Sequence, residues 1–246
     1  MRRAPRPQSY QNRTRSSVIP IRDENPTRSF PIATVLIIAA NLAVFLYEYS
    51  LDPVSLQSFM SRYALWPDRL LAAPLGAAAF SVLTSMFLHA GWLHVLGNML
   101  YLWIFGNNVE DRLGTARFVL FYLASGVVAA VAQVLAAGPA SIPVVGASGA
   151  IAGVLGAYLV LFPGASVVTL IPVFFFVEVA RLPAFIVIGF WFLLQLGNGV
   201  ASLGAATAAA GGVAWFAHIG GFVAGVLIAL VVRATLPDRT RRYYGW

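Results

Sequence analysis

Two glycine-rich stretches of this chain contain side chains suited to nucleophilic chemistry. Ser148 lies in the first, Gly146-Ala-Ser-Gly-Ala-Ile-Ala-Gly153, and His218 lies in the second, Ala217-His-Ile-Gly-Gly-Phe-Val-Ala-Gly225. A serine hydroxyl becomes a nucleophile when a base, usually a histidine, removes its proton. The two residues therefore indicate acyl transfer or hydrolysis, provided that the fold brings them together.

The glycines around these residues also have a purely structural interpretation. Gly146, Gly149 and Gly153 recur at spacings of three or four residues, as do Gly221 and Gly225. Small residues in this pattern line one face of a helix and let a neighbouring membrane helix approach closely. A lone histidine in a membrane helix is likewise a common structural hydrogen-bond partner. Residue types alone leave packing and catalysis as alternatives.

The composition places both stretches in a membrane protein. Of the 246 residues, 59% are hydrophobic and 10% are charged, whereas a soluble domain carries about 25% charged residues. A helix needs about 20 apolar residues to cross the hydrocarbon core. The sequence predicts an all-α, polytopic bundle of six transmembrane helices, at Pro31–Tyr49, Leu93–Val109, Phe118–Ala137, Ser148–Phe162, Pro183–Leu203 and Val213–Val232.

The distribution of arginine predicts the orientation of this bundle. Basic residues next to membrane spans mark the cytoplasmic side, and six spans put both ends of the chain on one side. All 16 basic residues are arginine, and only Arg62 and Arg69 would then lie outside. This favours a multi-pass protein of the cell membrane with cytoplasmic termini. The arginines beside the spans account for the net charge of +7. We therefore expect the lipid bilayer as a partner and do not expect nucleic acid.

The predicted organisation has three parts. Residues 1–29 form an Arg-rich tail that we expect to be disordered, residues 30–233 form the membrane domain, and residues 234–246 form a basic cytoplasmic tail. Two further apolar stretches, Leu71–Leu88 and Ala165–Val177, are interrupted or short, and we interpret both as interfacial or re-entrant.

The depth of the polar residues in the spans favours catalysis. His94 and Asn98 are four residues apart and share one helix face. Counted from the cytoplasmic span ends, these two residues, Ser148 and His218 all lie roughly 18–24 Å above the inner boundary. Independent structural residues have no reason to share one level. His89 would lie about 140° around the helix from His94, which argues against a shared metal.

The start of the fourth span suggests where water and an oxyanion would be accommodated. Because that span begins near Ser148, residues 138–147 must dip inward, which is tolerated only beside protein or a water-filled cavity. The Ser148 amide at the helix N-terminus could donate to an oxyanion together with His94 and Asn98. No Asp occurs in a predicted span, so Ser148 and His218 would act as a dyad. The chain has no cysteine, which excludes a thiol nucleophile, a cysteine metal site and disulfides.

These stretches resemble the motifs of the rhomboid intramembrane serine proteases over about residues 30–233. The resemblance implies a six-helix fold without metal or cofactor, in which Ser148 is the nucleophile and His218 the general base. It also implies that His94, Asn98 and the Ser148 amide stabilise the oxyanion. The substrates of such proteins are transmembrane segments of other proteins, cut near small residues. The matching stretches are Gly146-Ala-Ser-Gly149, His94-Val-Leu-Gly-Asn98, Ala217-His-Ile-Gly-Gly221 and Gly106-Asn-Asn-Val-Glu-Asp111 followed by Gly114.

One position departs from the family pattern. Some members carry a tyrosine four residues after the serine, packed on the histidine, and Ala152 stands there in this chain, so we expect a different support for His218. Glu110 and Arg112 fit a structural role at the end of the second span. Trp191 and Phe192 fit core packing better than a wall along which substrate passes.

Two other hypotheses remain. One is a catalytically silent rhomboid-like protein that binds transmembrane clients. The other is a small transporter or channel with a polar site at mid-membrane, although no inverted repeat is visible.

Overall fold

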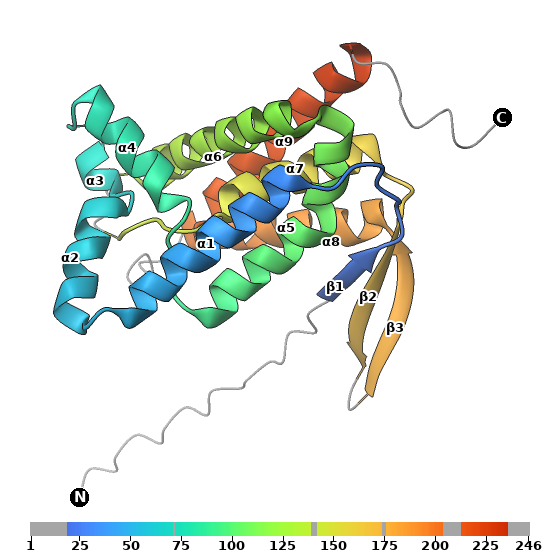
Figure 1. Cartoon of the computed structure of the whole chain (residues 1–246), viewed down its shortest axis with the longest axis horizontal. Helices are drawn as coiled ribbons and strands as arrows, with labels where there is room; N and C mark the ends of the chain where they lie inside the picture. The colour runs from blue at the N-terminus through green and yellow to red at the C-terminus, as the bar shows by residue number, and fades with distance from the viewer. Residues whose placement is uncertain (1–18, 71, 139–141, 174–175, 204–212, 236–246) are drawn as a thin grey trace, which may run out of the picture.

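The computed structural model describes residues 19–70, 72–138, 142–173, 176–203 and 213–235. Within these ranges the chain forms, in order, β1 (Ile19–Asp23), α1 (Ile32–Ser50), α2 (Pro53–Tyr63), α3 (Pro67–Leu70), α4 (Leu75–Ser85), α5 (Trp92–Leu113), α6 (Thr115–Ala137), α7 (Ser148–Leu161), β2 (Ser166–Val173), β3 (Phe176–Pro183), α8 (Ala184–Leu203) and α9 (Trp215–Thr235). Figure 1 shows α2, α3 and α4 at one end of the helix bundle and the strands at the other.

Each of the six predicted spans is a helix, namely α1, α5, α6, α7, α8 and α9. Four of these, α1, α6, α8 and α9, are long and apolar enough to cross a membrane. Helix α7 has 14 residues, and α5 carries Glu110, Asp111 and Arg112 near its C-terminal end. The predicted class is confirmed, because the chain is a mostly helical, multi-pass membrane protein.

Glycine and alanine allow α7 to lie at the centre of the bundle. The helix is buried along most of its length and packs against α5, α6, α8 and α9. A Cβ atom at Gly221 would overlap the Gly149 carbonyl oxygen, and one at Gly225 would overlap the Gly153 carbonyl oxygen. Helices α7 and α9 therefore touch backbone to backbone, as the glycine pattern predicted.

A buried carboxylate from α5 caps the start of α1. Helix α1 has no side-chain cap at its own N-terminus. Glu110 instead accepts hydrogen bonds from the backbone amides of Ala33 (2.9 Å) and Thr34 (2.8 Å) and from the hydroxyl groups of Thr34 and Thr115. An anion at a helix N-terminus compensates for the unpaired N–H groups there. The structural role predicted for Glu110 thus has a specific geometry.

A three-stranded antiparallel sheet, in the order β1-β2-β3, was not predicted. Ala165–Val177 forms β2 and enters β3, and its location at the membrane interface remains a prediction. It is rich in the β-branched residues Val, Thr and Ile, which favour strands over helices. Leu71–Leu88 contains the short helix α4, and its location at the membrane interface remains a prediction.

The predicted disorder of residues 1–29 is wrong for the part that the structure describes. Strand β1 pairs with β2, and the Asp23 carboxylate accepts hydrogen bonds from Asn108 (3.0 Å) and Tyr158 (2.7 Å). The strand is thus attached to α5 and α7. Residues 1–18 and 236–246, which include most of the two predicted tails, lie outside the described residues.

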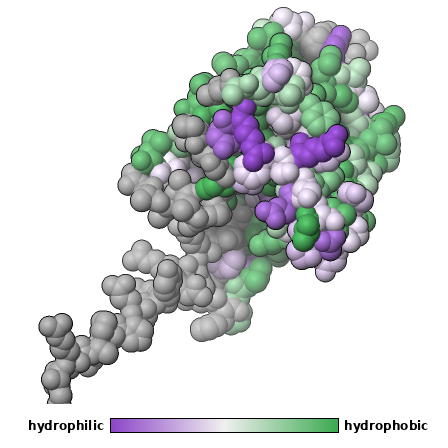
Figure 2. All heavy atoms as spheres, turned by 90° about the vertical axis from the view of Figure 1, so that its left-hand side faces the viewer, coloured by the Kyte–Doolittle hydropathy of each residue, from purple (hydrophilic) through white to green (hydrophobic). Residues whose placement is uncertain are grey.

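The end of the molecule formed by α2 and α3 is polar. Asp52 caps α2 by accepting hydrogen bonds from the amides of Val54 and Ser55, and Pro53 occupies the first helical position. Figure 2 looks onto this end and shows hydrophilic residues gathered in the middle of the face, with hydrophobic residues around them. This distribution fits a face in water bordered by lipid-facing sides.

Candidate active site

Ser148 and His218 lie side by side at the seam between α7 and α9. The serine Oγ is 2.8 Å from the histidine Nε2, a distance suited to proton transfer. Ser148 is the first residue of α7, and His218 lies one turn into α9. The close approach of the two helices, made possible by Gly149 and Gly221, positions this pair. Ser148 is half-buried, whereas His218 is 8% exposed.

The other ring nitrogen of His218 contacts helix α8. Gln195 Oε1 lies 2.9 Å from His218 Nδ1. The rings of Trp191 and Trp215 flank the imidazole at centroid distances of 5.8 and 6.3 Å. Ala152, the position at which some rhomboid proteases carry tyrosine, has a fully buried methyl group as its side chain. The different support expected for His218 therefore comes from α8 and α9.

His94 and Asn98 meet the chain just before Ser148. A Cβ atom at Gly146 would lie 2.8 Å from His94 Nε2 and 3.7 Å from Asn98 Nδ2, so both side chains contact this glycine. Gly146 has φ = +122°, a conformation that favours glycine. The amide of Gly146 donates to the Ser85 carbonyl (2.9 Å), which holds this extended segment against the end of α4. The structure thus gathers all four predicted polar residues around the start of α7.

The predicted separation of about 140° around one helix between His89 and His94 is wrong. It assumed one continuous helix, whereas α5 begins at Trp92 and His89 lies in the preceding loop. The two imidazole rings are 5.0 Å apart and edge to face, and the Asn98 amide donates to His89 Nε2 at 3.0 Å. The backbone amide of His89 donates to the buried carboxylate of Glu48 at 3.1 Å. Among the described residues no group of three or more His, Asp or Glu side chains is arranged to bind a metal.

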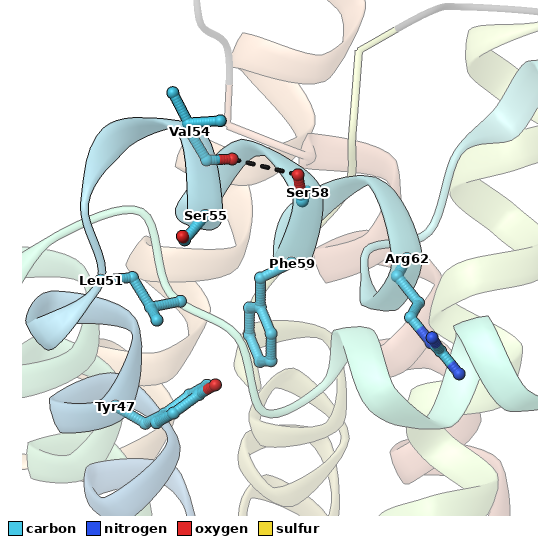
Figure 3. Close-up of a pocket in the computed structure, with 7 residues that line it drawn as sticks. All are labelled: Tyr47, Leu51, Val54, Ser55, Ser58, Phe59 and Arg62. Carbon is cyan, nitrogen blue, oxygen red and sulfur yellow. Dashed lines mark hydrogen bonds between the residues drawn. The ribbon is translucent and has the colours of Figure 1, made fainter.

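Two cavities differ in their relation to these residues. The larger, of about 390 Å³, lies between the end of α1 and α2, where Tyr47, Phe59 and Arg62 line it (Figure 3). It contains none of the predicted site residues. The smaller, of about 20 Å³, is bordered by Gly146 and Gly149, and it is large enough for about one water molecule. The Ser148–His218 pair therefore lies in the bundle interior, away from the larger cavity.

The sequence prediction did not select Gln195. The available signal was a polar side chain within an apolar span, which is the same signal that selected His218. Gln195 was missed because depth was compared only among the second, fourth and sixth predicted spans, which run from the outside to the cytoplasm. Helix α8 runs the opposite way, so its residues were not counted from the same boundary.

Comparison with known proteins agrees with this geometry. A profile described as the Rhomboid domain matches residues 77–235. The chain is 34% identical over 135 residues to YdcA of Bacillus subtilis (strain 168), a provisionally named rhomboid protease; the match covers 54% of this chain and 63% of YdcA. It is 44% identical over 78 residues to the rhomboid protease GluP of the same strain, covering 32% of this chain and 15% of GluP.

A mammalian relative extends the comparison. The chain is 35% identical over 156 residues to the mitochondrial presenilin-associated rhomboid-like protein of Mus musculus, which covers 61% of this chain and 38% of that protein. The matches span less than two thirds of the length of each of these three relatives.

Proposed function

Because this chain belongs to the rhomboid family, we propose that it is an intramembrane serine protease that cuts transmembrane segments of other proteins through a Ser148–His218 dyad. The observation that carries the proposal is the 2.8 Å contact between Ser148 Oγ and His218 Nε2. It joins a nucleophile and a base from two helices within an apolar bundle. Neither glycine packing nor a structural histidine requires this contact.

The proposed reaction begins with attack of Ser148 Oγ on a substrate peptide carbonyl. His218 Nε2 takes the hydroxyl proton as the new C–O bond forms. When the tetrahedral intermediate collapses, the C–N bond breaks and the same nitrogen gives the proton to the leaving amine. Water then attacks the acyl-serine ester, with His218 again acting as base, and the hydrolysis releases Ser148 and the second product.

The oxyanion of the tetrahedral intermediate needs donors near Ser148. The backbone amide of Ser148 lies at a helix N-terminus, where N–H groups lack partners within the helix. The side chains of His94 and Asn98 lie against Gly146, which is two residues before Ser148 in the chain. His94 Nδ1 is 3.5 Å from the Ala90 amide, a long contact in which Nδ1 accepts. That arrangement leaves Nε2 as the donor, as an oxyanion would require.

The test is cleavage of a single-span membrane protein by the purified chain in lipid vesicles, together with labelling by a fluorophosphonate probe. We expect Ser148→Ala and His218→Ala each to abolish cleavage, because members of a catalytic unit do not contribute additively. Ser125→Ala is the matched control. Ser125 is a buried serine on α6 whose hydroxyl has no hydrogen-bond partner in the described part of the structure, and its removal should leave the rate near that of the wild type.

The proposed protease function would be rejected if a folded wild-type chain neither cut the substrate nor reacted with the probe at Ser148. That outcome would favour the catalytically silent member of the family that binds transmembrane clients. Cleavage that persists in Ser148→Ala would exclude the Ser148–His218 dyad as the mechanism. The chain would then still be a hydrolase, but one that uses other residues.

The proposed setting is the cell membrane, with both termini in the cytoplasm and the α2–α3 end outside. The arginine distribution supports this orientation, and the polar face in Figure 2 fits an end of the molecule that lies in water. The partners are transmembrane substrates and the lipid bilayer. The reaction as written uses no cofactor and no metal ion.

A further inference from the structure

Helix α8 reaches the proposed base with a single polar side chain. Gln195 is 6% exposed, and its Oε1 lies 2.9 Å from His218 Nδ1. His218 therefore has a partner on each ring nitrogen, Ser148 on Nε2 and Gln195 on Nδ1. A neutral imidazole has a hydrogen on only one of its two nitrogens. The hydrogen-bond partners therefore decide which nitrogen can act as the base.

A second hydrogen bond fixes the direction of the Gln195 amide. Its Nε2 donates to the backbone carbonyl of Trp191 at 3.1 Å, one helical turn earlier. A carbonyl oxygen can only accept, so this bond requires the NH₂ group of the amide to point at Trp191. The amide oxygen must then face His218, where it can only accept from an Nδ1–H group. The lone pair of His218 consequently lies on Nε2, facing the Ser148 hydroxyl.

The packing between α8 and α9 sets the distance from Gln195 to the ring. Along α8, Phe192 stacks on Phe222 with ring centroids 4.1 Å apart. Gly199, further along the same face, lets Ile219 approach to 3.1 Å of where its Cβ atom would be. Gln195 lies between these two contacts, and residues at spacings of three and four share one helix face. The seam therefore presents the amide to His218 in one position.

We propose that Gln195 is the positioning residue of the dyad, holding His218 as the Nδ1–H tautomer with Nε2 directed at Ser148. The proposal rests on the proposed protease function and adds to it a third residue, from α8. A neutral amide acceptor takes the place of the carboxylate that orients histidine in a Ser–His–Asp triad. It does so without burying an additional charge in the bundle, which would be costly.

The experiment compares Gln195→Leu, Gln195→Glu and the control Leu194→Ala, whose side chain is 45% exposed on the same helix. We expect Gln195→Leu to lower kcat roughly ten- to a hundredfold with KM nearly unchanged, a part of the 10²–10⁴-fold that a general base contributes. In its protonated form the Gln195→Glu side chain can both accept from Nδ1 and donate to the Trp191 carbonyl, so it should restore much of the loss. Leu194→Ala should resemble the wild type.

Nitrogen-15 spectra of the imidazole rings supply a readout that simple loss of packing would not move. The chain has three histidines, and the His218 signal can be assigned by its absence in His218→Ala. We expect one Nδ1–H tautomer in the wild type and a mixture of tautomers in Gln195→Leu. An unchanged tautomer in Gln195→Leu, or a folded Gln195→Leu with wild-type kcat, would overturn the proposal.

These outcomes separate this proposal from the protease itself. If the wild type neither cuts substrate nor reacts with the probe, the protease fails, and the spectra still report whether Gln195 controls the tautomer. If the wild type is active and Gln195→Leu is equally active, the dyad stands and the positioning role is rejected.

Discussion

Asn98 shows how one side chain divides its donors between structure and chemistry. Its amide nitrogen carries two hydrogens, and one of them is engaged by His89 Nε2 at 3.0 Å. The contact holds the amide against Gly146, two residues before the proposed nucleophile. The second hydrogen is the one that the proposed oxyanion site would use. The orientation of Asn98 thus depends on a histidine outside the helix that carries it.

We expect Asn98→Ala to lower kcat by about 10²–10³ with little change in KM, as for the loss of one oxyanion donor. The reason is that the oxyanion exists only in the transition state and intermediate, not in the bound substrate. Steady-state kinetics on the single-span substrate would measure the effect. Asn107→Ala is the matched control on the same helix, since the Asn107 side chain contacts the Asn108 amide far from Ser148. A rise in KM alone for Asn98→Ala would contradict the assignment.

At the scale of helices, the distance between Ser148 and His218 is set by the packing of α7 on α9. Gly149 and Gly221 lie beside the Ser148–His218 pair, and Gly153 and Gly225 lie about one turn further along the same seam. This seam was predictable because glycine spacing and residue depth follow directly from helix geometry. The position of α8 was not predictable, because a contact such as that of Gln195 with His218 depends on how two helices rotate against each other.

We expect Gly225→Ala to destabilise the protein by about 1–3 kcal/mol, the usual cost of inserting a methyl group into a well-packed contact. The added Cβ atom would overlap the Gly153 carbonyl oxygen and push α9 from α7, so cleavage should also slow. Unfolding in mixed detergents and the cleavage rate would measure the two effects. Gly197→Ala is the control, since nothing lies within 4 Å of its Cβ position and alanine favours a helix over glycine. Equal stability of the two variants would contradict close packing at this seam.

At the scale of the whole molecule, the chain joins segments that are distant in sequence. Strand β1 pairs with β2, which connects α7 through β3 to α8. The sequence could not predict this sheet from local patterns, because the partner of β1 lies beyond four of the six spans. Apolar β-branched residues between two spans were also compatible with a segment lying in the membrane. The N-terminal strand is therefore attached to the same end of the bundle at which α8 begins.

Asp23 at the end of β1 makes this attachment dependent on pH. Burial raises the pKa of the Asp23 carboxyl above its ordinary value of 3.8, against the opposing effect of the Tyr158 hydrogen bond. The folded protein thus holds this proton more tightly than the unfolded chain, so the contribution to stability is greatest at low pH. It is lost as the pH rises from about 4 through the folded-state pKa.

The measurement is the difference in unfolding free energy between the wild type and Asp23→Asn, taken from pH 4 to pH 8. Asparagine mimics the protonated acid and can still accept from Asn108 and Tyr158 at one oxygen. We expect the wild type to lose stability relative to Asp23→Asn as the pH rises. A difference that is independent of pH would show that the carboxyl does not change its protonation on folding.

The orientation of the whole bundle can be tested because the chain contains no cysteine. Gln57 and Glu178 are both exposed, and the elements that carry them, α2 and β3, lie at opposite ends of the molecule (Figure 1). With cytoplasmic termini, a membrane-impermeant maleimide should label Gln57→Cys in intact cells and Glu178→Cys only after permeabilisation. The opposite pattern would place the arginine-rich ends outside, against the charge bias that orients membrane helices. It would also place the α2–α3 face, and not the strands, on the cytoplasmic side.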